Sequence, residues 1–211
     1  MTEQARIFAY EAHAAQIYGE CQPYPVHLED VVRILASEWC RCTPSCPSVI
    51  LAAGYLHDVV EDTPTTIEDI QDSFGPEVAS IVAFCTDETG PDRRTRKALT
   101  YARMRKTIDE HPYDNLPGWL QDAIRVKLAD RLANLRACLT GSRPRLWEMY
   151  AKERETFGQA LYVEGVCDAM WREYDRLLSN PPRYSAKDLR SEAQMRVFRE
   201  VYGGTKNEVP E

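Results

Sequence analysis

The sequence predicts an all-α fold, and three observations support this prediction. Apolar residues recur every three to four positions along most of the 211-residue chain, which is the spacing of one helix face. Hydrophobic residues make up 44% and charged residues 28%, a balance typical of a globular domain with a sizeable core. No β-hairpin signal, internal repeat or low-complexity tract stands out. We therefore expect a helical bundle.

The first two helices are expected over residues 3–19 and 27–40. In the first segment Ile7, Tyr10 and Ile17 lie close to the 3.6-residue period of an amphipathic helix. The second segment repeats this pattern in HLEDVVRILASEWC. Each helix is therefore expected to bury one face against the rest of the bundle.

Three further helices follow in the first half of the chain. The segment 48–62 is apolar nearly all round in its first half, as is typical of a central helix. Thr66 is a suitable cap for a helix over 67–74. The Gly-Pro pair at 75–76 ends that helix and starts another over 76–88, because glycine favours helix ends and proline the first helical turn.

The second half of the chain contains four more expected helices, the first of them basic after an initial loop and the second long and central. They cover residues 90–110, 119–139, 145–162 and 164–180. We assign residues 1–180 to a single helical domain. Residues 181–211 are expected to be a C-terminal extension, partly helical and ending in a mobile polar tail.

Charge and composition exclude several classes of partner. The net charge of −7 argues against a general affinity for nucleic acid or an anionic membrane. No apolar run reaches the roughly 18 to 20 residues that a membrane span needs. The N-terminus has no basic region followed by an apolar one, so no secretion signal is expected. The sequence leaves the oligomeric state open.

The cysteines indicate a reducing compartment. Seven cysteines, an odd number, are spread along the chain, which fits reduced thiols of a cytoplasmic protein better than a disulfide framework. The cluster Cys40, Cys42 and Cys46 is an alternative zinc site. It offers only three local ligands and lacks paired knuckle spacing, so a loop between two helices is the favoured interpretation.

An unusual group of polar residues lies in the segment GYLHDVVEDTPTT, residues 54–66, at the end of an apolar helix. His57 and Glu61 are four residues apart, as are Asp58 and Asp62, so each pair would share one helix face. Burying an ionised carboxylate costs several kcal/mol unless it is paired or binds a metal. One turn is thus suited to holding a metal and the next to directing carboxylates at water bound to it.

A second segment, VKLADRLANL, repeats this feature. It places Asp130 in an apolar helix with Asn134 one turn later, and His27 opens an earlier helix. Taken singly, His27 fits a surface or capping residue, and Asp130 fits a partner of Arg131. Taken together with the first segment, two imidazoles and two carboxylates suit a divalent ion such as Mn²⁺, Fe²⁺, Mg²⁺ or Zn²⁺. These four candidate ligands are His27, His57, Asp58 and Asp130.

The order of these residues resembles that of a known family. A histidine, a His-Asp doublet and a later aspartate follow one another in the HD metal-dependent phosphohydrolase superfamily. The stretches HDVVEDT and VKLADRLANL are similar to the hydrolase domain of the RelA/SpoT alarmone enzymes, and to the stand-alone small alarmone hydrolases of the metazoan SpoT-homologue type. The resemblance runs from about residue 5 to about residue 178 and implies an HD-type helical bundle.

The resemblance implies a reaction and a cofactor. The four candidate ligands match residues that hold Mn²⁺ in the family. Glu61 and Asp62 match a pair that assists a metal-activated water in removing the 3′-pyrophosphate of guanosine tetra- or pentaphosphate. Asn134 matches an asparagine that contacts the nucleoside. This chemistry is sound, because a metal lowers the pKa of its water and a nearby carboxylate accepts the proton.

An anionic nucleotide also needs cationic contacts. Arg96 and Lys97, in the run DRRTRK, are most similar to the family's basic pair, although a solvated helix start is an equal alternative. Tyr150 matches a tyrosine of the family's pocket, and the alternative for this residue is a place in the core. The expected partner is therefore a small-molecule nucleotide.

The chain departs from the family at one point. The relatives carry an Arg-Lys type pair about ten residues before the first metal histidine, where it recognises guanine, and this chain has Gln16 and Ile17 there. The same chemistry on an adenosine alarmone or NADPH therefore stays open. A catalytically silent HD module that binds nucleotides is the third alternative, and the presence of both Glu61 and Asp62 argues against it.

Overall fold

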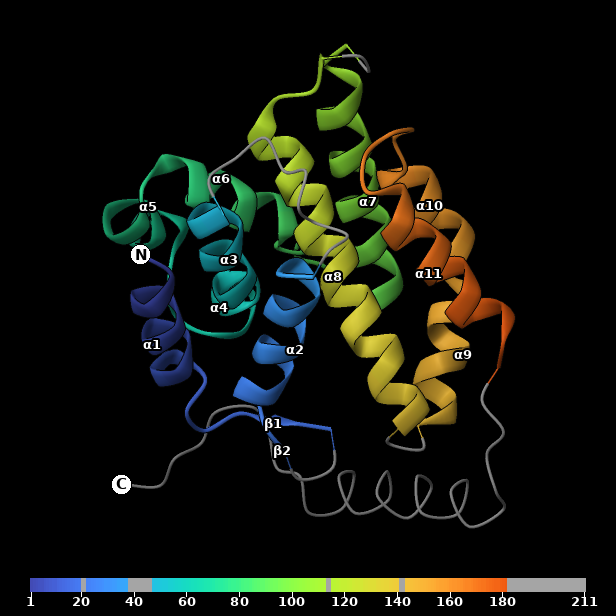
Figure 1. Cartoon of the computed structure of the whole chain (residues 1–211), viewed down its shortest axis with the longest axis horizontal. Coiled ribbons are helices and arrows are strands. Elements are labelled where there is room, and N and C mark those ends of the chain that lie inside the picture. The colour runs from blue at the N-terminus through green and yellow to red at the C-terminus, as the bar shows by residue number, and fades with distance from the viewer. Residues whose placement is uncertain (20–21, 38–46, 113–114, 141–142, 182–211) are drawn as a thin grey trace.

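The computed structural model describes residues 1–19, 22–37, 47–112, 115–140 and 143–181. In these ranges the protein is all-α, as predicted, apart from one short two-stranded sheet. Its elements are shown in Figure 1. They are α1 (Thr2–Ala12), β1 (Ile17–Tyr18), β2 (Gln22–Pro23), α2 (Pro25–Leu35), α3 (Pro47–Leu56), α4 (Val59–Asp62), α5 (Ile67–Phe74), α6 (Pro76–Cys85), α7 (Arg93–Asp109), α8 (Gly118–Thr140), α9 (Pro144–Lys152), α10 (Arg154–Leu161) and α11 (Asp168–Ser179).

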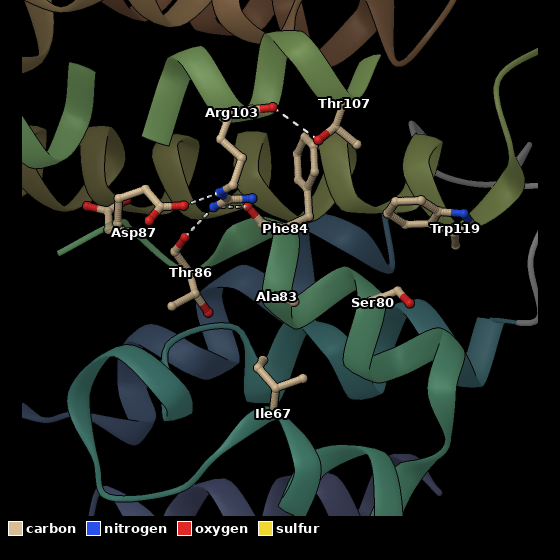
Figure 2. A pocket seen from close by; sticks show the side chains of 10 residues that line it. Ile67, Ser80, Ala83, Phe84, Thr86, Asp87, Arg103, Thr107 and Trp119 are labelled. Carbon is tan, nitrogen blue, oxygen red and sulfur yellow. Dashed lines mark hydrogen bonds and ion pairs between the residues drawn. The ribbon is translucent and has the colours of Figure 1, made fainter. Parts of the chain in front are cut away.

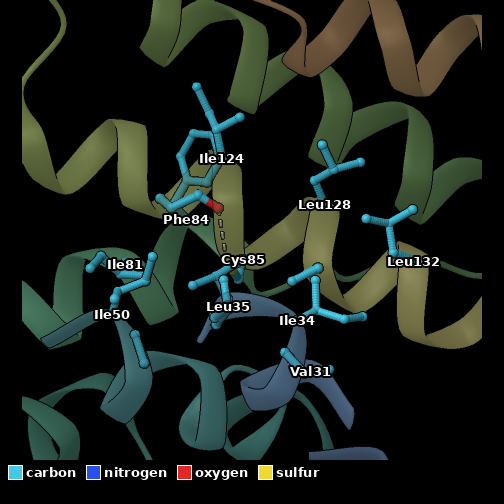
Figure 3. Close-up of a cluster of buried hydrophobic side chains, with 14 of the residues drawn as sticks. Val31, Ile34, Leu35, Ile50, Ile81, Phe84, Cys85, Ile124, Leu128 and Leu132 are labelled. Carbon is cyan, nitrogen blue, oxygen red and sulfur yellow. Dashed lines mark hydrogen bonds between the residues drawn. The ribbon is translucent and has the colours of Figure 1, made fainter. Parts of the chain in front are cut away.

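The long helix α8 is the centre of the bundle, as its apolar sequence predicted. It packs against α2, α3 and α6 on one side and against α9 and α11 on the other (Figure 1). Buried apolar side chains of α2, α3, α6 and α8 meet in one core (Figure 3). Ile34, Phe84 and Leu128 are examples from three of these helices, each at most 4% exposed. This core fixes the ends of α2, α3 and α6 relative to the middle of α8.

The N-terminal helix is shorter than expected. Helix α1 ends at Ala12, and the strands β1 and β2 form an antiparallel hairpin in which Ile17 pairs with Pro23. The buried residues of α1 are Ala5 and Ala9, whereas Ile17 is 60% exposed. The expectation of one helix over 3–19 without a hairpin was therefore wrong. Strands of two residues are too short to show the period-2 pattern by which a hairpin is recognised.

The expected helix over 48–62 is interrupted at its most polar point. Helix α3 ends at Leu56 and α4 begins at Val59, so His57 and Asp58 form the joint between them. The segment 145–162 is similarly divided, at Glu153, into α9 and α10. The predicted cap of α5 is confirmed, because Thr66 and Asp69 form a capping box.

Two predictions fall on parts of the chain outside the described residues. These are the loop or zinc cluster at Cys40, Cys42 and Cys46, and nearly all of the C-terminal extension, 182–211. Among the described residues, no helix combines the length and the apolar character needed to cross a bilayer.

Candidate metal centre

The four predicted ligands come together at one point, although they lie far apart in the sequence. His27 lies in the first turn of α2, His57 and Asp58 join α3 to α4, and Asp130 lies in the middle of α8. One ligand atom from each of these residues can be chosen so that all lie within 4.8 Å of one another. The His57 Nε2 atom is 2.9 Å from Asp58 Oδ2, and His27 Nε2 is 3.3 Å from Asp130 Oδ1.

The hydrogen bonds of His57 indicate that this cluster fits a cation. Its Nδ1–H donates to the carbonyl oxygen of Gly54 at 2.9 Å, which leaves an unshared electron pair on Nε2. That atom is buried, faces the Asp58 carboxylate and has no hydrogen-bond partner among the described residues. An electron pair and a carboxylate repel each other unless a proton or a metal ion lies between them. Backbone hydrogen bonding by the second ring nitrogen is the usual arrangement of metal-binding histidines.

The electrostatics of the cluster lead to the same conclusion. Burial alone would lower the pKa of His57, but the charge of Asp58 and the hydrogen bonds that a protonated Nε2 could donate to Asp130 and Asp58 raise it well above 6.5. Burial would raise the pKa of both carboxyl groups, yet the two imidazoles hold them well below 3.8. Without a cation the cluster must therefore bind protons on its imidazoles. A divalent ion replaces those protons, and the mixed nitrogen and oxygen ligands suit several such ions.

Three polar side chains orient the ligands. The Tyr24 hydroxyl donates a short hydrogen bond to Asp58 Oδ2. Asn134 donates to Asp130 Oδ1 at 2.6 Å and accepts a hydrogen bond from the Tyr18 hydroxyl at 3.1 Å. The Tyr18 ring also stacks on His27, with ring centroids 4.8 Å apart. The two tyrosines had no sequence signal, because their roles depend on the hairpin that precedes α2.

Glu61 and Asp62 lie on α4, one turn beyond the joint, and are exposed. Neither belongs to the cluster of four ligands. The Glu61 Oε2 atom accepts a hydrogen bond from the Asp87 backbone N–H at 3.1 Å. The Asp62 Oδ2 atom accepts one from the side-chain amide of Gln16 at 2.7 Å. Both carboxylates are thus held at the edge of the centre, in contact with loops rather than with the ligands.

The loop that contacts Glu61 is itself fixed by an arginine. Arg103 of α7 donates to Glu88 Oε1 and to the Thr86 carbonyl oxygen, each at 2.6 Å, in a cavity of about 500 Å³ (Figure 2). Asp87, which lies between Thr86 and Glu88 in the sequence, forms an ion pair with Lys97 at 2.6 Å. The guanidinium of Arg103 therefore stabilises the loop through these hydrogen bonds, so its charge in this cavity is accounted for without a bound ligand.

The predicted cationic contacts are only partly brought together. Lys97 lines a cavity of about 780 Å³ between α7 and α9, and Arg96 is not among the residues that line it. Four further cations line the cavity. They are Arg93, Arg94, Arg145 and Lys152.

Tyr150 lies in a nearly buried position on α9. It is 7% exposed, with the Arg131 guanidinium 4.4 Å from its ring centroid, and its neighbour Met149 lines the cavity instead. Tyr150 is therefore packed in the core, and its contact with a substrate stays a prediction. The alternative pairing of Asp130 with Arg131 is wrong, because Arg131 donates to Glu153 Oε2 at 3.0 Å.

Comparison with known proteins identifies related sequences. The profile of a family described as HD domain matches residues 5–158. A human protein named guanosine-3′,5′-bis(diphosphate) 3′-pyrophosphohydrolase MESH1 is 32% identical over 165 residues, which cover 77% of this chain and 83% of that protein. The Drosophila melanogaster protein of the same name is 35% identical over 114 residues, and the chain spans only 55% of its length.

A solved structure is similar as well. It is described as a metazoan ortholog of SpoT that hydrolyses ppGpp, and it shares 26% sequence identity with this chain. The superposition has a TM-score of 0.64 and covers 83% of this chain and 93% of the other. The similarity thus extends over the helices that carry the four ligands and beyond them.

Proposed function

Because the chain belongs to the HD domain family, we propose that it is a hydrolase that removes the 3′-pyrophosphate of a guanosine alarmone, (p)ppGpp, with Mn²⁺ as its cofactor. The observation that carries the proposal is the buried cluster in which the free electron pair of His57 faces a carboxylate. The reaction is the one named for the human and Drosophila relatives.

In this proposal the residues of the centre have different roles. The four clustered side chains would hold the ion. When bound, the ion lowers the pKa of water and offsets the negative charge of the attacked phosphate. Glu61 and Asp62 would act as a general-base pair toward that water, because their carboxylates lie one turn beyond the ligands and do not belong to the cluster that would hold the ion. Asn134 orients Asp130 and would also contact the nucleoside.

The basic cavity would bind the remaining phosphates. A nucleotide with two pyrophosphate groups carries several negative charges, and five cations line this cavity. Lys97 is connected to the centre through its ion pair with Asp87, whose backbone N–H donates to Glu61. Arg96, at the start of α7 beside Lys97, is a second proposed phosphate contact.

One observation favours a second substrate class. The side-chain amide of Gln16 donates a hydrogen bond to Asp62, and Ile17 is an exposed apolar residue. Neither residue therefore supplies a cation for guanine. An adenosine alarmone or NADPH, hydrolysed by the same chemistry, is therefore the alternative substrate. A silent nucleotide-binding module is the alternative without catalysis.

A nucleotide panel tests these proposals. Metal-stripped protein, verified by elemental analysis, is assayed with guanosine and adenosine alarmones and NADPH, with and without Mn²⁺, and the products are separated by chromatography. We expect pyrophosphate release from the guanosine alarmone that chelation abolishes and Mn²⁺ restores. Full turnover by the stripped protein would contradict the metal dependence. Binding of a nucleotide without release of any phosphate would favour the silent module.

A further inference from the structure

The residue that departs from the family pattern has a definite contact in this structure. The side-chain amide of Gln16, just before β1, donates to Asp62 Oδ2 at 2.7 Å, across 46 positions of sequence. This bond joins the hairpin to the last residue of α4. A hydrogen bond to an ionised carboxylate is stronger than one between neutral groups, so it restricts the Asp62 side chain more than a neutral contact would.

The orientation of the Gln16 amide is fixed from its other end. His13 Nδ1 lies 2.6 Å from Gln16 Oε1, so the imidazole N–H donates to the amide oxygen and the amide nitrogen must face Asp62. The other ring nitrogen of His13 is buried and has no hydrogen-bond partner among the described residues. Burial also lowers the pKa of His13, which favours the neutral ring.

The His13 ring is in turn fixed by the metal centre. It stacks on Tyr24 with ring centroids 4.4 Å apart and planes inclined by 22°. The Tyr24 hydroxyl donates to Asp58, one of the four clustered ligands. A continuous path of contacts therefore leads from the ligand Asp58 through Tyr24, His13 and Gln16 to Asp62. The three intermediate residues of this path lie outside the α3–α4 segment, which carries the carboxylates of Asp58 and Asp62.

We propose that Gln16 is a positioning residue that holds the Asp62 carboxylate at the edge of the metal centre, with His13 fixing its amide. The proposal rests on the proposed function, in which Asp62 accepts a proton from water. Asp62 is exposed at the end of a four-residue helix, which by itself does not restrict a side chain. Gln16 supplies the missing restraint, because precise placement of a general base is part of its efficiency.

The test is a double-mutant cycle with Mn²⁺-loaded full-length protein. Gln16→Leu removes the amide and keeps similar bulk, and we expect it to lower kcat about tenfold or more while KM and bound metal stay within about twofold. In an Asp62→Asn background the same change should lower kcat by less than about twofold, because Gln16 acts through that carboxylate. His13→Phe keeps the ring on Tyr24 and should reproduce most of the loss.

A matched control is available on the surface. Gln159 donates to Glu155 at 3.1 Å on α10, the same type of glutamine–carboxylate bond, so Gln159→Leu should leave kcat unchanged. An effect of Gln16→Leu on KM alone, or a loss that persists in full beside Asp62→Asn, would overturn the proposal, since either result assigns Gln16 another role.

A second readout separates this proposal from the proposed function. The side-chain NH₂ signal of Gln16, identified in an NMR spectrum by its loss in Gln16→Leu, should move in both Asp62→Asn and His13→Phe. An unmoved signal would show that the contact is absent and would overturn the proposal directly. Wild-type kcat in Asp62→Asn together with a moved signal would instead refute the assigned role of Asp62, and with it the catalytic part of the inference.

Discussion

Removal of the divalent ion should lower the melting temperature of the protein, because its ligands are buried together. The carboxylates of Asp58 and Asp130 belong to a cluster whose ligand atoms lie within 4.8 Å of one another. Two unit charges 4.8 Å apart repel by about 3.5 kcal/mol at an effective dielectric constant of about 20. In the metal-free protein, protons on His27 and His57 relieve this repulsion. A divalent ion relieves it without those protons.

The size of the effect follows from mass action. An ion present at about 100 times its dissociation constant stabilises the folded state by about 2.7 kcal/mol, provided that it does not bind the unfolded chain. For a chain of 211 residues, 1 kcal/mol changes the melting temperature by about 2 to 4 °C. We therefore expect an increase of about 5 to 11 °C on adding saturating Mn²⁺.

The increase should depend on pH in a definite direction. The pKa of His57 is raised above 6.5 in the metal-free fold, so the stability contributed by its proton is fully present below pH 6.5. That stability is lost as the pH rises through the raised pKa. The ion needs the neutral imidazole, so protons compete with it at low pH. The difference in melting temperature between loaded and stripped protein should therefore grow as the pH rises above 6.5.

The assay is thermal unfolding followed by circular dichroism, with stripped protein, Mn²⁺ titration and elemental analysis. Asp130→Asn removes one ligand charge and should abolish most of the increase. Asp175→Asn is the control, because its carboxylate pairs with Arg154 on the surface and should leave the increase unchanged. Melting curves that agree within about 1 °C with and without saturating ion, at all pH values tested, would refute the reasoning.

Two further predictions concern catalysis and stability. Glu61→Gln and Asp62→Asn should each lower kcat by at least roughly a hundredfold while metal content, from elemental analysis, stays near wild type; a variant that loses its ion would place that residue among the ligands. Glu153→Leu should lower the free energy of unfolding in urea by about 3 to 5 kcal/mol, because it leaves the buried Arg131 without its carboxylate. Arg93→Ala removes the 40%-exposed partner of Glu153 and should cost less than about 1 kcal/mol, so equal losses for the two variants would be unexpected.

The sequence predicted the helices and the ligand cluster because both have local signals. Long amphipathic segments show their period, and Asp58 and Asp130 were conspicuous as charges in apolar segments. The hairpin had no such signal, because its strands are only two residues long. The break at His57 was equally invisible, since no glycine or proline occupies the joint between α3 and α4.

The contacts of Tyr24 and Gln16 with the carboxylates of the centre could not be predicted, for a different reason. Tyr24 and Gln16 act on partners 34 and 46 positions away, and no pattern within one element reports such a contact. Tyr150, which stays a predicted pocket residue, is not among the residues that line the cavity between α7 and α9, whereas its neighbour Met149 is. On a helix one position is a rotation of about 100°, enough to exchange a cavity side chain for a core one.

The hairpin connects the proposed catalysis with the choice of nucleotide. The side-chain amide of Gln16 is hydrogen-bonded to Asp62, so the position at which the sequence resemblance implies a base-recognising cation contacts a carboxylate here. A cation nevertheless lies against the same hairpin. The Arg143 guanidinium, from the turn before α9, is 5.0 Å from the ring centroid of Tyr18, and it fits there because residue 19 is a glycine whose missing Cβ would clash with it. The Tyr18 hydroxyl donates a hydrogen bond to Asn134, which is the proposed nucleoside contact. In the proposed function, a charge supplied from this side would reach the nucleotide without competing for Asp62, so the lack of a basic pair at positions 16 and 17 would remove one route to guanine and leave Arg143 beside the hairpin.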